Sequence, residues 1–514
     1  MLIGLLLRVW QCCWYPLRED EALYGYWARL IVSGRDVMLE RVAVDKPPFF
    51  IYTLARWFEW FGSTDASGRS LNVLISVLTM VAVWLLGRRV FGPRGGLWSL
   101  AFFALSPFAI SFAPTMYTDP LLTLWIVLAL LAASWRLGLL TGLALGMGFA
   151  TKQNALLFIP LILPALLLGH YPKVIANMCK KQMQGEKQRL MRIIYWILPV
   201  ITMSLGFGYI WHKVWQWDGW RILPANIPDF WTQSWHSYGG LRLVAAGDWP
   251  ARLIEWWQVW RWWGGSLAGT VIITALGIIA VLASKFDARN ARTQTGFSSD
   301  DEEDEQLDER KWILLFALFS ITYLALHFFF SFQAWDRYLL PLTPLIAILS
   351  AQGALWLWEQ SRFWRLWKRW IAVALLATGV LWGAGRAASA RIPVGGDHGA
   401  FDGLPIVADY LRQNTPFYHG LVYQRWLGWQ WNWYLWDGPP REYWANPDML
   451  VENLASHPTG YTRFVVFPGW YLDEKPTLQR ALEPLGLNLE TRLRLTDPES
   501  DRIMFVVYQI VGAE

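Results

Sequence analysis

Residues 119–152 read DPLLTLWIVLALLAASWRLGLLTGLALGMGFATK, and this stretch decides the fold class. Two apolar runs, 119–135 and 137–151, flank the single basic residue Arg136. An apolar run of about 20 residues can cross the roughly 30 Å hydrocarbon core of a bilayer as a helix. The stretch therefore predicts two membrane-spanning helices that turn at Arg136 on the inner side.

Apolar runs of the same kind recur as far as residue 386, at 1–15, 70–87, 95–113, 154–170, 193–212, 264–284, 312–331, 338–358 and 370–386. They predict an α-helical polytopic membrane protein with about 11 transmembrane helices. Hydrophobic residues make up 54% of the chain and charged residues 17%, whereas soluble domains carry about 25% charged residues. These values exclude an ordinary soluble enzyme, a disordered chain and a disulfide-stapled secreted fold.

The basic residues indicate the topology. The chain has 45 basic and 40 acidic residues, a net charge of +5, and the basic excess lies in short loops between apolar runs. This pattern is typical of the cytoplasmic loops of a membrane protein rather than of a nucleic-acid-binding surface. It predicts a transmembrane domain over 1–386 with an inner N-terminus and with outer loops at 16–68 and 213–263. An odd number of spans then places residues 387–514 on the extracytoplasmic side.

Residues 387–514 alternate helical and strand patterns and predict a small α/β domain. We expect helices near 402–414, 447–456 and 477–485, and strands near 420–424, 463–467 and 503–511. Aromatic residues crowd one part of this domain: Tyr423, Trp426, Trp429, Trp431, Trp433, Tyr434 and Trp436. Sugar rings stack on such side chains and membrane interfaces also recruit them, so both alternatives stay open.

Ionisable residues at the membrane edge are the first candidates for function. Asp20 and Glu21 follow the first apolar run directly. Adjacent carboxylates near a bilayer surface can supply a general base, which a hydroxyl nucleophile needs. The structural alternative is the start of a helix, where acidic residues are favoured at the positive end of the helix dipole.

The first outer loop also holds Lys46, just before the aromatic segment 49–62. That segment is too polar to span and predicts a helix that lies along the outer interface among membrane lipids. Lys46 is then placed to meet an anionic group, although a lysine that only extends toward the headgroups explains it equally well.

Three more charged residues lie at outer ends of apolar runs. Asp119 begins one run, where capping of a helix is the simple explanation. Lys152 places a positive charge outside, against the loop bias, which suggests an anionic partner such as a phosphate. Arg337 follows Asp336 and either pairs with it or holds phosphate oxygens.

Six short segments together resemble the C-type (GT-C) membrane glycosyltransferases that use polyprenyl-phosphate sugars, such as the protein O-mannosyltransferases and the lipid A aminoarabinose transferases. The segments are DEALY (20–24), DKPPFF (45–50), GRSLN (68–72), LSP (105–107) with Asp119, GMGFATK (146–152) and RYLLP (337–341). They follow the family's order within the membrane domain.

The resemblance implies roles for individual residues. Asp20 matches the catalytic aspartate, with Glu21 beside it, and Asp119 resembles a second acidic residue of the active site. The positions around the lipid phosphate match Lys46, Arg69, Lys152 and Arg337.

The implied activity is a hexosyl or pentosyl transfer, with inversion, from a polyprenyl-phosphate donor to a hydroxyl of a lipid, glycan or protein acceptor. It is expected on the outer face of the cytoplasmic membrane. A polytopic transporter or lipid-linked-sugar flippase without transferase activity is the alternative. It predicts charges near the bilayer midplane rather than at span ends.

No motif requires a cofactor or a metal. The sequence has no GxxxxGK[ST], no convincing GxGxxG after a strand, no HExxH and only three cysteines, which form no CxxC pair. A divalent cation between Asp20 and Asp119 stays an open alternative that no pattern supports.

Overall fold

The computed structural model describes residues 1–10, 15–170, 188–237, 242–294, 300–363, 366–393, 399–456, 460–498 and 500–512. The chain divides into two units. We call them the membrane unit, Met1–Cys12 with Ala28–Gly395, and the C-terminal unit, Cys13–Trp27 with Gly396–Glu514. The C-terminal unit therefore starts a few residues later than the predicted domain 387–514, and it includes part of the first predicted outer loop.

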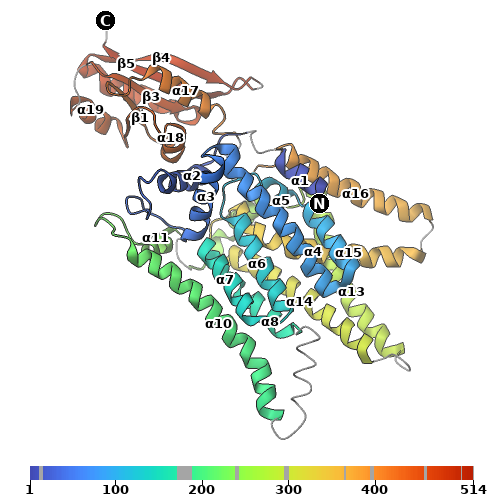
Figure 1. Ribbon diagram of the computed structural model, residues 1–514. Helices are drawn as coiled ribbons and strands as arrows, with labels where there is room; N and C mark the ends of the chain where they lie inside the picture. Colours follow the sequence, from blue (N-terminus) through green and yellow to red (C-terminus); the bar gives the residue numbers. More distant parts are fainter. Residues whose placement is uncertain are drawn as a thin grey trace. The chain divides into compact units, whose positions relative to one another are not determined.

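The membrane unit is almost wholly helical (Figure 1). Its apolar helices are α1 Leu2–Val9, α4 Asp65–Ala104, α5 Pro107–Phe112, α6 Asp119–Ser134, α7 Gly138–Thr151, α8 Ile159–Leu168, α10 Gln188–Trp220, α13 Leu267–Gln294, α14 Asp300–Phe329, α15 Thr343–Gln360 and α16 Leu366–Ala388. The 3-10 helices η1 Gln153–Phe158 and η3 Asp336–Leu342 precede α8 and α15. The predicted spans from 70–87 to 370–386 overlap these helices. Of the predicted span 1–15, α1 covers Leu2–Val9, and residues 11–14 lie outside the described residues.

Among the described residues, five helical segments are long and apolar enough to cross a membrane. They are Asp65–Ala104, Leu267–Lys285, Glu309–Phe329, Asp336–Gln360 and Leu366–Ala388. The helices α6, α7 and η1 with α8 are apolar but shorter. The chain is a polytopic helical membrane protein, and the number of eleven spans stays a prediction.

Helix α4 contains a sharp turn that makes it two antiparallel segments. Gly92 has φ 70° and ψ −177°, outside the helical region. A methyl group on Gly87 would lie 2.7 Å from Ser99 Oγ, although twelve residues of straight helix span about 18 Å. The chain therefore reverses at Gly92, where glycine adopts the positive φ without strain. This agrees with the two predicted spans, 70–87 and 95–113.

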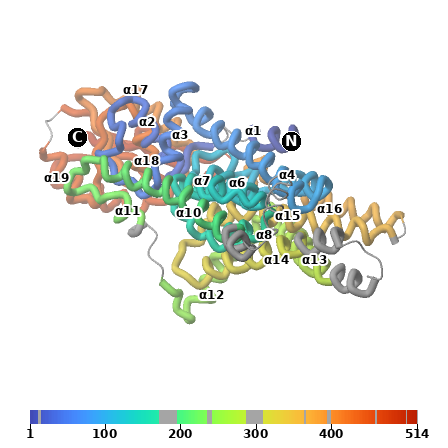
Figure 2. Tube along the Cα trace, turned by 60° about the horizontal axis from the view of Figure 1, so that its bottom comes forward, coloured from blue at the N-terminus to red at the C-terminus, as the bar shows by residue number. Residues whose placement is uncertain are grey.

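Helices α10, α7, α6 and α4 follow one another as a layer (Figure 1), and Figure 2 shows α6 and α7 side by side from a second direction. Glycines bring α7 and α10 into backbone contact. A methyl group on Gly142 would lie 1.9 Å from the carbonyl oxygen of Met203, and one on Gly138 would lie 2.0 Å from that of Pro199. Small residues allow such close approach in membranes, where packing rather than hydrophobicity joins helices.

Outside the apolar helices, the membrane unit contains the last turn of α2 Glu19–Val32, then α3 Pro48–Phe61, α11 Phe230–Ser237 and α12 Trp249–Trp260. Helix α3 begins with proline at its first position, which has no backbone N–H to satisfy. Trp60 and Phe61 at its end are exposed. These features fit the predicted interfacial helix at 49–62.

The C-terminal unit is a five-stranded mixed sheet with strand order β2-β1-β3-β5-β4. The strands are β1 Gly420–Gln424, β2 Arg441–Tyr443, β3 Thr462–Pro468, β4 Leu487–Thr496 and β5 Ile503–Gly512. Strand β1 pairs in parallel with β2 and β3, and β5 pairs antiparallel with β3 and β4. Its helices are α17 Leu404–Asn414, α18 Gly428–Tyr434, α19 Pro447–Ser456 and α20 Lys475–Leu482.

The six predicted elements of this domain are present, and β1 and α19 have the predicted bounds. Strands β2 and β4 and helix α18 were not predicted. The core of the sheet includes Tyr423, Trp444, Val465, Phe467 and Val506, all buried. The small α/β domain expected from the sequence is thus confirmed as a fold, although with a larger sheet.

One buried arginine fastens α1 to α4. Arg8 is fully buried, and its guanidinium donates to Ser76 Oγ at 2.8 Å and to the carbonyl oxygens of Ala104 at 2.8 Å and Phe103 at 3.1 Å. We expect Arg8→Met to lower the free energy of unfolding by about 2 kcal/mol, because a buried acceptor left without a donor costs about 1–3 kcal/mol. Thermal unfolding in detergent measures this. The exposed Arg88→Met is the control, and equal midpoints for the two variants would contradict the expectation.

Candidate active site

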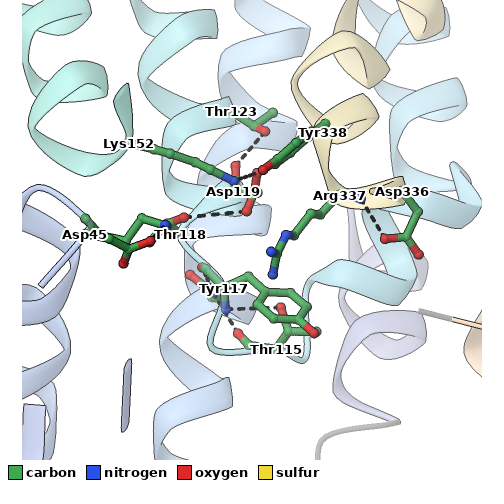
Figure 3. Close-up of polar contacts among 12 residues, drawn as sticks. Asp45, Thr115, Tyr117, Thr118, Asp119, Thr123, Lys152, Asp336, Arg337 and Tyr338 are labelled. Atoms are coloured by element: carbon green, nitrogen blue, oxygen red, sulfur yellow. Dashed lines mark hydrogen bonds and ion pairs between the residues drawn. The ribbon is translucent and has the colours of Figure 1, made fainter. Parts of the chain in front are cut away.

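The centre of the candidate site is a buried ion pair. Lys152 Nζ lies 2.6 Å from Asp119 Oδ1, and each side chain is 2% exposed (Figure 3). A charge removed from water is costly unless an opposite charge and further hydrogen bonds compensate it. Asp119 and Lys152, which the sequence indicated as separate candidates, are therefore partners in the structure.

Local structure places each member of the pair. Asp119 is the first residue of α6, before Pro120, where an acidic side chain is favoured. Thr123 Oγ1 donates to the Asp119 carbonyl oxygen at 2.8 Å. Lys152 ends α7 because its backbone is extended, with φ −159° and ψ 135°. The capping explanation of Asp119 is wrong: Thr118 occupies the cap position without a side-chain cap hydrogen bond, and Asp119, the next residue, pairs with Lys152 instead.

Aromatic rings surround the cations. Lys152 Nζ lies 4.7 Å from the centre of the Tyr338 ring, and the Arg337 guanidinium carbon lies 5.2 Å from that of Tyr117. Figure 3 shows the Arg337 guanidinium directed toward Tyr117, while its backbone N–H donates to Asp336 Oδ1 at 2.7 Å. Cation–π contacts of this kind hold a positive charge in place.

Lys46 is joined to the same region through the residue that follows Lys152. Its ammonium pairs with Asp45. Gln153 Nε2 donates to the carbonyl oxygen of Asp45 and to Ser234 Oγ. Gln153 thereby fastens the first outer loop and α11 to the end of α7. Gln153 could not be recognised from the sequence, because an uncharged amide beside a lysine has no distinctive pattern.

Lys152 lies in the turn between the end of α7 at Thr151 and the start of η1 at Gln153. Burial, together with the positive charges of Arg337 and Lys46, lowers the pKa of Lys152 from 10.5 to about 8, although Asp119 opposes the shift. The contacts bring the four residues into one region: Lys152 pairs with Asp119 and lies against Tyr338, which follows Arg337. Gln153 binds the backbone of Asp45, which precedes Lys46.

Arg69 is fully buried in the first turns of α4. One turn later, Asn72 Nδ2 donates to the carbonyl oxygens of Thr115 at 2.7 Å and Tyr117 at 2.8 Å. Asn72 thus fixes the loop that leads to Asp119. The role of Arg69 at the lipid phosphate stays a prediction.

Asp20 and Glu21 belong to the C-terminal unit and lie in the first turn of α2. Glu21 is fully buried, and its Oε2 accepts from the Arg18 backbone N–H at 3.3 Å. This is the contact by which an acidic residue in the first turn closes the start of a helix. Asp20 is half-buried. Glu21 stabilises the start of the helix, as the structural alternative describes. The catalytic roles of Asp20 and Glu21 stay predictions.

Across the described ranges, no group of three or more histidine, cysteine, aspartate or glutamate side chains is placed to hold a metal ion.

The chain is similar to known membrane glycosyltransferases. Residues 45–183 match the family model described as dolichyl-phosphate-mannose-protein mannosyltransferase. Solved structures of ArnT share the fold of nearly the whole chain. The predicted resemblance to the C-type membrane glycosyltransferases is confirmed.

Two relatives of known function are undecaprenyl phosphate-alpha-4-amino-4-deoxy-L-arabinose arabinosyl transferases. The protein of Edwardsiella ictaluri (strain 93-146) is 29% identical over 29% of this chain and 29% of its own. That of Proteus mirabilis (strain HI4320) is 27% identical over 37% of this chain and 34% of its own. The matched stretches span about a third of the length of these relatives.

The structure is similar to that of ArnT from Cupriavidus metallidurans. The apo state gives a TM-score of 0.60 at 15% identity, covering 98% of this chain and 95% of that one. The state bound to undecaprenyl phosphate gives 0.55 at 15% identity, covering 98% and 96%. At this identity, the likeness shows the fold.

The ion pair makes a prediction about stability. Asp119→Asn leaves the Lys152 ammonium buried and uncompensated, so we expect the free energy of unfolding at pH 7 to fall by about 3 kcal/mol. The double variant Asp119→Asn with Lys152→Met removes both charges. We expect it to recover most of the free energy of unfolding that Asp119→Asn loses. Thermal unfolding of the three proteins in detergent tests the pairing. A double variant no more stable than Asp119→Asn contradicts it.

Proposed function

We propose that the protein transfers a sugar from a polyprenyl-phosphate donor to a hydroxyl group of an acceptor. One observation carries this proposal: Lys152 is held in a buried ion pair with Asp119 and lies against the ring of Tyr338, the residue after Arg337. Gln153, the residue after Lys152, binds the backbone of Asp45, the residue before Lys46. The fold shared with the C-type transferases and the relatives that use undecaprenyl phosphate support it.

The cations suit a leaving phosphate. When the bond between the sugar and the phosphate breaks, negative charge grows on the phosphate oxygens. Fixed positive groups that face this charge stabilise the transition state more than the ground state. In this proposal Lys152 and Arg337 contact the phosphate, Lys46 and Arg69 lie around it, and Asp119 orients Lys152.

The membrane unit also offers room for the lipid. An apolar cavity of about 300 Å³ lies among α13, α14 and α15. Its walls include Ile273, Ile278, Val281, Leu324 and Leu349. A prenyl chain is a suitable occupant because it is apolar and flexible. No nucleotide site is needed when the sugar arrives on a lipid.

The chemistry needs a base and an acceptor. We assign Asp20 as the group that accepts the proton of the acceptor hydroxyl while that oxygen attacks the anomeric carbon. The polyprenyl phosphate leaves from the opposite face, so the configuration inverts. The C-terminal unit, which contains Asp20 and Glu21, is proposed to receive the acceptor on the outer face of the cytoplasmic membrane. The acceptor is a lipid, a glycan or a protein.

Sugar transfer by Asp20→Asn tests the function. The purified protein in lipid is given radiolabelled polyprenyl-phosphate sugars and host lipid extract, and label on the acceptor is counted. We expect Asp20→Asn to lose at least about 100-fold in rate, because general base catalysis contributes about 10²–10⁴-fold. The neighbouring, exposed Glu19→Gln is the control.

Two outcomes contradict the proposal. Unchanged transfer by Asp20→Asn removes its role as the base. A wild-type protein that moves the labelled carrier between leaflets but transfers no label shows a flippase.

The pKa of Lys152 predicts how donor binding depends on pH. Lys152 is charged below its pKa of about 8 and loses its charge as the pH rises through that value. We therefore expect the donor KM to rise between about pH 7.5 and 9. In Lys152→Arg, which keeps its charge throughout this range, the rise should be absent. Initial rates against donor concentration from pH 6 to 9.5 give the donor KM of each protein. Identical pH profiles of the donor KM for the wild type and Lys152→Arg contradict the expectation.

A further inference from the structure

One arginine holds the segment between α2 and α3 to the end of α10. Arg221 directly follows α10, and its side chain is fully buried. Its Nε and Nη2 atoms both donate to the carbonyl oxygen of Leu39, at 3.2 and 2.6 Å, and Nη2 also donates to that of Val42 at 3.3 Å. Its Nη1 pairs with Asp218 Oδ1 at 3.1 Å. The guanidinium thus joins parts of the membrane unit that are far apart in the sequence.

Leu39 has a backbone conformation that residues with a side chain disfavour. Its φ is 56°, in the left-handed region, where the Cβ atom of an L-residue is crowded. The residue is nevertheless fully buried. A strained conformation persists only where the surrounding structure imposes it, and residues of this kind gather at functional sites. The two hydrogen bonds from Arg221 to the Leu39 carbonyl oxygen help to impose it.

Further contacts fix the segment 36–42, which we call the Leu39 loop. The Asp36 carboxylate accepts from two backbone N–H groups of the loop, both at 2.8 Å. Tyr52 Oη of α3 donates to a carbonyl oxygen of the loop at 2.8 Å. Glu40 Oε1 accepts from the backbone N–H of Ile222 at 3.0 Å. The Leu39 loop is therefore held from several sides and has a defined shape.

The Leu39 loop leads directly to Lys46, which follows Val42 by four positions. Just before Lys46, the carbonyl oxygen of Asp45 accepts from Gln153 Nε2. The short segment that ends at Lys46 is therefore attached at both ends. Arg221 fixes one end, and Gln153 fixes the other.

The two attachment points are connected through α11. Asp218 Oδ1, which pairs with Arg221, also accepts from the backbone N–H of Phe230, the first residue of α11, at 3.1 Å. Ser234 of the same helix accepts from Gln153 Nε2. The end of α10, α11 and the end of α7 therefore form one connected set of contacts around the segment that carries Lys46.

We propose that Arg221 is a positioning residue for the donor phosphate, and that it acts through Lys46 by fixing the Leu39 loop. The inference rests on the proposed function for the role of Lys46. A fixed cation stabilises the charge on a leaving phosphate only from the correct position, and a misplacement of about 1 Å can cost about 100-fold in rate. Arg221 does not serve as a phosphate ligand itself, since its Nε, Nη1 and Nη2 atoms each have a partner within the protein.

The geometry requires a guanidinium rather than a positive charge alone. Three nitrogen atoms in one plane reach two carbonyl oxygens and one carboxylate at the same time. A lysine ammonium has the same charge but lacks this planar arrangement of donors. The variant Arg221→Lys therefore separates positioning from a general electrostatic attraction of the donor.

Binding of radiolabelled undecaprenyl phosphate to the purified full chain in detergent tests the proposal, together with the donor KM. We expect Arg221→Lys and Arg221→Met each to weaken carrier binding and to raise the donor KM by about tenfold, with an unchanged acceptor KM. Arg56→Lys and Arg56→Met are the matched controls, because Arg56 is 72% exposed on α3 and pairs only with Glu59. Wild-type carrier affinity in Arg221→Lys overturns the inference.

A double-mutant cycle separates positioning from a purely structural role. If Arg221 acts through Lys46, the two substitutions are not additive. Arg221→Lys should then change carrier affinity less than twofold in a protein that already carries Lys46→Met. A tenfold loss that persists in the Lys46→Met background overturns the inference.

A second variant keeps the test valid if Arg221→Met folds poorly. Arg221→Met leaves the Asp218 carboxylate buried without its counter-charge, whereas the double variant Asp218→Asn with Arg221→Met removes both charges. The asparagine oxygen can still accept from Phe230. We expect this double variant to have a higher unfolding midpoint than Arg221→Met and the same tenfold loss of carrier affinity. Wild-type carrier affinity in the double variant overturns the inference.

The outcomes distinguish this inference from the proposed function. Carrier binding and sugar transfer that are equal in the wild type and Arg221→Lys remove the positioning role and keep the transferase. A wild-type protein that neither binds the carrier nor transfers sugar removes the proposed function, and the positioning of Lys46 for a donor with it.

Discussion

The ion pair between Lys152 and Asp119 is the constraint on which the site in the membrane unit depends. Two charges buried in an apolar bundle are tolerated only when they meet, so the end of α7 and the start of α6 have to lie together. The packing of the layer provides this: Gly142 brings α7 against α10, and Asn72 fixes the loop before Asp119. The remaining cations then follow, since Gln153 fastens the loop of Lys46 to the same place.

Hydropathy predicts the helices because membrane insertion depends on a local property of the sequence. The run 119–135 becomes α6, which ends one residue earlier. Strand β4 was missed although Leu487, Leu489, Leu493 and Leu495 alternate with polar residues, because charged residues among them obscure the apolar face. Helix α18 was missed because tryptophan and tyrosine usually favour strands. Its short helix depends on tertiary contacts, such as that of Arg412.

The site was only partly predictable for a different reason. Lys152 was a candidate because it places a positive charge on the predicted outer side, where basic residues are rare. Asp119 was a candidate because it begins an apolar run. Their pairing joins residues 33 apart in the sequence, and only the packing of α6 on α7 reveals it. Gln153 and Asn72 carry no charge and match no motif, so their hydrogen bonds could not be expected. The clustering of residues 13–27 with the C-terminal unit is a long-range property of the same kind.

The buried pair also limits which carboxylate can act as a base. If Asp119 took up a proton, the Lys152 ammonium at 2.6 Å would remain buried without a counter-charge. Asp119 is therefore poorly suited to act as the base, which is why the proposed mechanism gives that role to another residue. The cations give the matching argument for the donor. Arg337 and Lys46 both destabilise the charge on Lys152, and a phosphate among them relieves that repulsion. The same electrostatic arrangement thus favours an anion at Lys152 and assigns proton transfer to another residue.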